Sequence, residues 1–153
     1  MKRQMLVFQW FFAVLLGSLP FLLFAGGPPD RATPEVDSRT MELRVIRHGA
    51  LLWRYTRFNT ESDYPCLRFE SISTDENWRI ADQQDVCDVV LPDGHRLAFE
   101  NTAYAGFSDI QFSPEEPEFR FRIEYIRKTA AGEINMECRL PITGDRFGTV
   151  KCQ

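Results

Sequence analysis

Few residues in this 153-residue chain could carry covalent chemistry. His48 and His95 are its two histidines, and each lies in or beside a predicted turn. A histidine can combine with distant carboxylates once a chain folds, which keeps a hydrolase open as a hypothesis. The sequence has no Gly-x-Ser-x-Gly elbow, phosphate loop, dinucleotide fingerprint or His-Glu-x-x-His motif. We therefore predict no catalytic residue and no cofactor.

A short acidic stretch is the best candidate for binding a cation. Asp82, Asp85 and Asp88 lie close together, with two glutamines between the first pair. Calcium takes six to eight oxygen ligands from a suitable loop, and the spacing of an EF-hand is missing. We therefore predict no metal site, and interpret Asp82 and Asp85 as possible contacts for a basic protein partner.

Two further segments could contact a partner. Glu115 and Glu116 lie between two prolines in an acidic loop, and Tyr104 lies among small residues in the predicted loop Asn101–Gly106. Tyrosine is a frequent anchor residue in protein interfaces. The alternative for the acidic loop is a gatekeeper that keeps the following strand from pairing wrongly.

All four cysteines lie between residues 66 and 152, and no two of them form a Cys-x-x-Cys motif. A predicted turn at Thr143–Arg146, centred on Asp145, places Cys138 directly opposite Cys152. Cys66 then pairs with Cys87 by elimination, although the two other connectivities stay open. An even number of cysteines behind an export signal indicates disulfides formed in an oxidising compartment.

The net charge of −4 gives no sign of nucleic-acid binding, but the charges are unevenly distributed. Residues 58–118 contain fourteen acidic residues against three arginines, whereas residues 41–57 and 119–153 are each net basic. The acidic and basic segments could neutralise each other within the fold. Alternatively, the acidic segment forms a face for a basic partner or a cation.

The N-terminus has the pattern of an export signal. Lys2 and Arg3 precede an apolar stretch, Met5–Ala25, which predicts that the following domain lies outside the cytoplasm. Residues 1–25 are either a cleaved signal peptide or an uncleaved membrane anchor, because the stretch can span a bilayer and its cleavage site is poor. Residues 26–40 are predicted to be a flexible linker and residues 41–153 a globular domain, either in the periplasm or on the extracellular side, secreted or held at the inner membrane.

The globular domain has the alternation of β-strands. Apolar residues alternate with charged ones over residues 119–125 and again over residues 134–142, with a hairpin-length loop between them. We expect Phe119, Phe121, Ile123, Tyr125, Met136 and Leu140 to be buried, and Arg120, Arg122 and Arg139 to be exposed. Of two registers considered, we prefer the one that places Glu124 opposite Arg139.

The remaining segments predict an all-β fold of about eight short strands, arranged as a small antiparallel sandwich or barrel. Residues 73–85 could instead hold one short helix. The predicted strands are Met41–Arg47, Leu51–Phe58, Cys66–Ile72, Val86–Leu91, His95–Glu100, Phe107–Phe112, Phe119–Arg127, Ile134–Ile142 and Phe147–Cys152.

Three functional hypotheses follow. The first is a non-enzymatic exported domain that binds another protein, with neutralisation of a toxin or hydrolase in the cell envelope as one form. The second is an envelope hydrolase that uses scattered carboxylates and a histidine. The third is a structural subunit of a membrane-envelope complex, in which Met5–Ala25 contacts the membrane.

Overall fold

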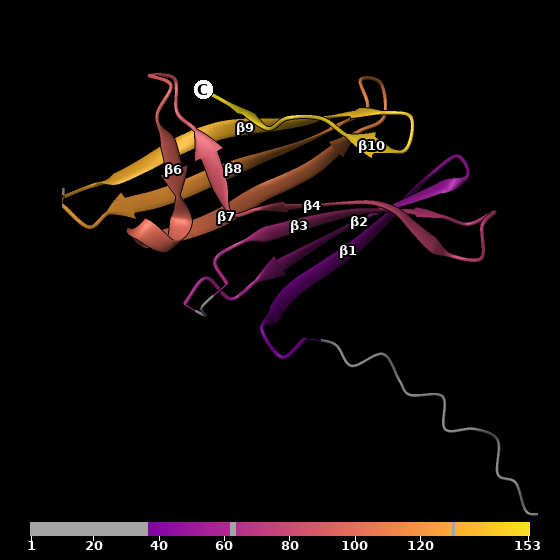
Figure 1. The fold of residues 1–153 in the computed structure, drawn as a ribbon, viewed down its shortest axis with the longest axis horizontal. Helices are drawn as coiled ribbons and strands as arrows, with labels where there is room; N and C mark the ends of the chain where they lie inside the picture. The colour runs from indigo at the N-terminus through magenta and orange to yellow at the C-terminus, as the bar shows by residue number, and fades with distance from the viewer. Residues whose placement is uncertain (1–36, 62–63, 130) are drawn as a thin grey trace, which may run out of the picture. The chain divides into compact units, whose positions relative to one another are not determined.

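The computed structural model describes residues 37–61, 64–129 and 131–153. They contain eleven β-strands, one short 3-10 turn (η1, Phe99–Asn101) and no α-helix (Figure 1). The predicted all-β, antiparallel fold class is therefore confirmed. The signal or anchor at 1–25 and most of the linker at 26–40 lie outside the described residues. Across the described ranges, no helix has the length and apolarity needed to cross a membrane.

The first sheet is a meander in which each strand pairs with the next, in the order β1-β2-β3-β4. Its two central strands carry large aromatic side chains that are fully covered: Trp53 and Tyr55 of β2, and Phe69 of β3, are all buried. These side chains point from one face of the sheet into the core. The strands are β1 (Thr40–His48), β2 (Leu51–Phe58), β3 (Leu67–Ser73) and β4 (Arg79–Val86).

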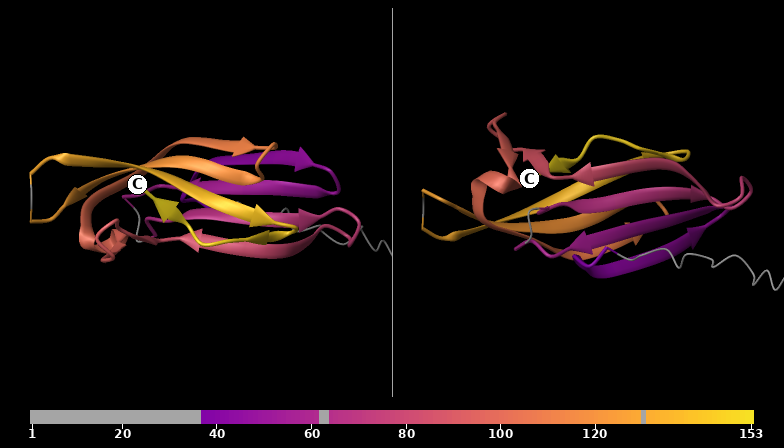
Figure 2. Two further views of the ribbon diagram at one scale, coloured as in Figure 1. Left: turned by 90° about the horizontal axis from the view of Figure 1, so that it is seen from above. Right: turned by 60° about the horizontal axis from the view of Figure 1, so that its bottom comes forward.

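The second sheet has the order β10-β9-β8-β7, and β11 also pairs with β9. A separate two-stranded hairpin, β5 with β6, follows the first sheet in sequence. The two large sheets form separate layers (Figures 1 and 2). The strands are β5 (Asp88–Val90), β6 (Arg96–Ala98), β7 (Thr102–Ser113), β8 (Glu118–Arg127), β9 (Glu133–Thr143), β10 (Arg146–Phe147) and β11 (Lys151–Cys152).

The core lies between the two sheets and is rich in aromatic rings. The ring of Phe69 lies 4.7 Å from that of Phe119 and 5.6 Å from that of Phe121, measured between centroids. Such tilted pairs add to the stabilisation from buried area. The predicted inward face of β8 and β9 is confirmed, because all six of its residues are buried: Phe119, Phe121, Ile123, Tyr125, Met136 and Leu140.

One side of this sandwich-like fold is closed by contacts of β3 and β4 with β10 and the turn before it. The main-chain N–H of Phe147 donates to Oδ2 of Asp82 over 2.8 Å, and Oγ of Ser71 donates to the carbonyl oxygen of Asp145 over 2.6 Å. These side-chain to main-chain bonds replace a continuous ladder where the two sheets meet. The result is a half-barrel with one closed side.

Two segments differ from what the sequence suggested. Residues 73–85 do not form a helix, because Arg79–Val86 is the strand β4, paired with β3. The polar run along β4 hides the alternation that would have marked it as a strand. The turn before it reverses the chain through Asn77 and Trp78, at φ values of 55° and 62°. Residues 102–106 also belong to a strand, β7, and not to a loop.

The preferred register of the β8–β9 hairpin was wrong as well. Glu124 pairs with Asn135, and the other register considered, with Glu137 opposite Glu124, is also absent. The actual pairing places Arg122 opposite Glu137, which is a favourable cross-strand pair. It also places Arg120 opposite Arg139, and this pair of like charges is central to the candidate site.

Both disulfides join the predicted partners, Cys66 with Cys87 and Cys138 with Cys152. Cys138 and Cys152 face each other directly in the β9–β11 ladder, as the turn symmetry predicted. The second bridge therefore fastens the end of the chain to β9.

Candidate functional site: an arginine surface on the second sheet

Three cationic residues form a row across neighbouring strands of the second sheet. Arg120 of β8 is directly opposite Arg139 of β9, and Arg139 is directly opposite Lys151 of β11. Directly opposed residues of an antiparallel sheet project from the same face. Their chain neighbours Phe121 and Cys138 are buried, so this face is the outer one. We call Arg120, Arg139 and Lys151 the cation row.

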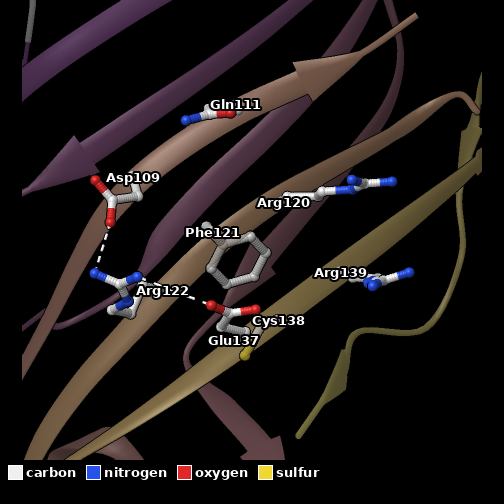
Figure 3. A pocket seen from close by; sticks show the side chains of 8 residues that line it. All are labelled: Asp109, Gln111, Arg120, Phe121, Arg122, Glu137, Cys138 and Arg139. Carbon is white, nitrogen blue, oxygen red and sulfur yellow. Dashed lines mark ion pairs between the residues drawn. The ribbon is translucent and has the colours of Figure 1, made fainter. Parts of the chain in front are cut away.

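A second chain of charges lies beside the cation row. Arg122 contacts carboxylates on both sides: its Nη1 lies 2.8 Å from Oδ2 of Asp109, and its Nη2 lies 3.8 Å from Oε1 of Glu137. Figure 3 shows Arg122 held between these two acids, while Arg120 and Arg139 lie away from them. Asp109 reaches Arg122 from a bulge in β7, where its φ is 52°.

The members of the cation row differ in how far their charge is compensated. Arg120 donates a hydrogen bond to Glu118, which raises the pKa of the guanidinium. Nη2 of Arg120 also lies 3.5 Å from Oε2 of Glu116. Arg139 and Lys151 have no ion-pair partner among the residues that the structure describes. Both are exposed. The row thus ends in two adjacent cations without an internal counter-ion.

An open hollow of about 420 Å³ lies over this surface. Three strands contribute to it, namely β7, β8 and β9, and Figure 3 shows the side chains around it. The lining residues are Asp109, Gln111, Arg120, Phe121, Arg122, Glu137, Cys138 and Arg139.

The surface is suited to binding a carboxylate. A guanidinium offers several N–H donors in a fixed plane and can hold a carboxylate through two parallel hydrogen bonds. Arg139 is free to do so, and Lys151 adds a second positive charge beside it. The two acids of the hollow, Asp109 and Glu137, are already engaged by Arg122. The arrangement therefore favours a bound anionic group over a cation.

The five residues predicted to contact a partner are spread over the fold. Asp82 accepts the hydrogen bond from β10, and Asp85 is held by Arg68. Burial acts to raise the pKa of Asp85, but the hydrogen bonds from Arg68 and Tyr64 and the charge of Arg68 together outweigh it, so that the pKa is lowered. The other three residues, Tyr104, Glu115 and Glu116, are exposed at the start of β7 and in the β7–β8 turn. The structure does not bring the five together.

The two histidines also lie apart. His95 Nδ1 is 3.2 Å from Oδ1 of Asp93 at the tip of the β5–β6 hairpin, where the two side chains are 82% and 61% exposed. His48 ends β1 and its ring lies 5.6 Å from that of Phe112. The His95–Asp93 pair has the right groups for proton transfer, but it is open to water on a hairpin tip.

The aspartates considered for calcium are occupied by protein donors. Asp88 forms an ion pair with Arg96 at 2.6 Å, and Asp85 forms one with Arg68 at 2.7 Å. In the part of the chain that the structure describes, no group of three or more His, Cys, Asp or Glu side chains could hold a metal ion.

Among the described residues, four acidic side chains of residues 58–118 form ion pairs with arginines of the flanking basic segments, which agrees in part with the first alternative for the uneven charge distribution. Arg54 holds Glu70, Arg122 holds Asp109, and Arg120 contacts Glu118. This internal pairing includes Arg120, and it leaves Arg139 and Lys151 of the cation row without a counter-ion among the described residues.

The sequence contained a signal for the cation row. Arg120 and Arg139 were predicted to be exposed, but the wrong register separated them. Lys151 was not singled out, although the same turn symmetry that placed Cys138 opposite Cys152 places Lys151 opposite Arg139. Combining that symmetry with the correct β8–β9 register would have revealed the row.

The chain matches no protein-family model, no curated protein and no solved structure. Its function must therefore be inferred from the chemistry of its own surfaces.

Proposed function

We propose that this protein is a non-enzymatic, exported binding domain that holds a protein partner through carboxylates docked on the cation row. The supporting observation is the pairing of Arg120, Arg139 and Lys151 across three strands. Like charges directly opposite each other destabilise a sheet. A partner carboxylate between Arg139 and Lys151 would remove that repulsion and form charge-assisted hydrogen bonds.

The location outside the cytoplasm is supported by the two disulfides, which fit an oxidising compartment. The apolar segment Met5–Ala25 remains the proposed signal or anchor, and its preceding basic residues support the proposal that the domain lies in the periplasm or on the extracellular side.

The sign of the partner's charge differs from the one that composition suggested. The acidic middle of the chain favoured a basic partner, but Asp85 and Glu116 lie against arginines in the fold. The uncompensated pair Arg139 and Lys151 favours an acidic contact segment instead. Neutralisation of a toxin or hydrolase remains one form of this function, provided that the target offers Asp or Glu side chains.

A short fluorescein-labelled oligoglutamate peptide tests the proposal with the full-length chain in detergent micelles. We expect saturable binding by fluorescence anisotropy, weakened by added salt. The double variant Arg139→Gln/Lys151→Gln should weaken binding about tenfold, because it removes two exposed charge pairs that contribute up to about 1 kcal/mol each.

The matched control is Arg127→Gln/Lys128→Gln. These two exposed cations lie at the β8–β9 turn, so the control removes the same charge away from the cation row. Equal losses in the two double variants would show a general charge effect and contradict the site.

A further inference from the structure

The edge strands of the two sheets differ in how far their unpaired main-chain groups are open to another chain. An exposed edge strand offers unpaired N–H and C=O groups to another chain, so most proteins interrupt, shorten or cover it. At β4, part of the edge is contacted by β10, where the main-chain N–H of Phe147 donates to Asp82. At β7, the edge is interrupted by irregularities between Ser108 and Gln111, with Asp109 at a φ of 52°. The strands β10 and β11 have two residues each.

The outer edge of β1 has none of these features over most of its length. The strand has nine residues, and its pairing with β2 is regular from Glu42 to His48 after one bulge at the start. It ends the order of the first sheet, so no described strand pairs with its outer side. It contains neither proline nor lysine, the residues that commonly protect an edge.

Apolar side chains are exposed along this edge. Leu43 is 46% exposed and Val45 is 50% exposed, and both lie on the outer face of the sheet. Met41, at the bulge, is 62% exposed. On the other face of the strand, the side chain of Arg44 is 68% exposed and lies 3.0 Å from Glu42.

We propose that β1 pairs with β1 of a second copy of this chain, antiparallel and about a two-fold axis at Leu43. In this register Leu43 faces Leu43 of the partner subunit, and Glu42 of each copy faces Arg44 of the other. Val45 falls against Met41, beside the bulge. One face of the new ladder is therefore apolar, and the other carries two pairs of opposite charges, which favour this cross-strand pairing.

The neighbouring two-fold registers are less complementary. An axis at Arg44 places the two Arg44 side chains opposite each other and sets each Glu42 against Ile46. An axis at Val45 sets Leu43 against Arg47 and Arg44 against Ile46. When a second copy of the strand runs antiparallel about Leu43, Glu42 lies opposite Arg44 on both sides of the axis. This charge complementarity favours the first register over the other two. Pairing of this kind is β-augmentation between identical edges.

The register is tested by cysteine cross-linking of the full-length chain in cells that export it. Opposed residues lie within disulfide range, so Leu43→Cys should give a cross-linked dimer on a non-reducing gel after mild oxidation. The two Val45 positions would lie about 13 Å apart along the strands, outside disulfide range, so Val45→Cys should give no dimer. Val90→Cys, exposed on β5, measures random collisions.

A second arm tests the charges. In the double variant Leu43→Cys/Arg44→Glu, Glu42 of each copy faces a glutamate of the other copy. The repulsion between these carboxylates should abolish the cross-link. Arg44 is on the surface, so this change leaves the fold intact, and circular dichroism checks that it does. The proposal is overturned if Leu43→Cys cross-links no more than Val90→Cys, if Val45→Cys gives the dominant dimer, or if Arg44→Glu has no effect.

Discussion

Ser71 of β3 donates a 2.6 Å hydrogen bond from its hydroxyl to the main-chain carbonyl oxygen of Asp145, a residue 74 positions further along the chain. Ser71 is fully buried, and Asp145 lies in the turn between β9 and β10. The bond joins the first sheet to the end of the second at the closed side of the half-barrel. That side also positions β10 and so the start of the segment that carries Lys151.

Ser71→Ala should lower the free energy of unfolding by about 1–2 kcal/mol, because it leaves the carbonyl of Asp145 without its donor. Guanidinium denaturation at neutral pH measures the loss. Ser73→Ala is the matched control, since Ser73 lies on the same strand, is only partly buried and should cost less than about 0.5 kcal/mol. Equal effects of the two changes would show that the Ser71 bond adds no stability.

The bridge between Cys138 and Cys152 fastens β11, and with it Lys151, to β9. Replacing both cysteines by alanine should lower stability by roughly 3 kcal/mol, as expected when a loop of this length is opened. It should also weaken oligoglutamate binding, because Lys151 loses its place beside Arg139. Non-reducing peptide mapping of the unaltered protein should find Cys66 joined to Cys87, and a peptide joining Cys66 to Cys138 would refute the pairing.

Strands with strong alternation could be predicted from sequence, whereas polar strands and register could not. The alternation of residues 119–125 identified the buried face of β8, including Phe121 and Tyr125. β4 was missed because its polar residues serve the closed side of the half-barrel, a role that depends on the distant strand β10. The residues of β4 alone do not predict that contact.

Predicting the candidate site required the register of β8 and β9, which the loop between them does not determine. Residues 128–132 allow several registers, and charge pairing favoured Glu124 opposite Arg139. The structure pairs Phe121 with Cys138 and Ile123 with Met136. The register with Glu124 opposite Arg139 would also have joined the two apolar faces, so alternation alone does not separate the two. In the actual register the like charges Arg120 and Arg139 face each other, which charge pairing alone would not have predicted.

Glu70 lies on the central strand β3 with a side chain only 5% exposed, held by two hydrogen bonds from Arg54 of 2.7 and 2.8 Å. Arg54→Met should cost about 2–3 kcal/mol, because it leaves a buried carboxylate without its partner. Arg54→Met/Glu70→Leu should recover most of that loss, since removing both charges avoids the penalty. Urea denaturation of the three proteins tests this order.

The control for this pair is Arg96→Met. Arg96 also holds a carboxylate, that of Asp88, but its own side chain is 72% exposed. Exposed ion pairs contribute little, so this change should cost less than about 1 kcal/mol. A loss in Arg96→Met as large as that in Arg54→Met would contradict the role of burial.

The stability of the fold should depend on pH through the contact between Tyr55 and Glu42. The hydroxyl of Tyr55 donates to Oε1 of Glu42 over 2.8 Å. This hydrogen bond, together with the charges of Arg57 and Arg44, lowers the pKa of Glu42 below its usual value of 4.5, against the opposing effect of burial. A lowered pKa in the folded state stabilises the protein above the unfolded pKa, and the stabilisation is lost as the pH falls through the folded pKa.

Tyr55→Phe removes the hydrogen bond, so its free energy of unfolding should lie about 1 kcal/mol below that of the unaltered protein at pH 7. The difference in the free energy of unfolding between the two proteins should narrow between about pH 5 and pH 3. Glu42 becomes protonated there, so the hydrogen bond from Tyr55 no longer stabilises its charged form in the unaltered protein. Tyr104→Phe removes the same atom from an exposed side chain on β7 and should show no gap at any pH. Urea denaturation at each pH measures all three proteins. Curves for Tyr55→Phe and the unaltered protein that stay parallel down to pH 3 would show that Tyr55 does not lower the pKa of Glu42.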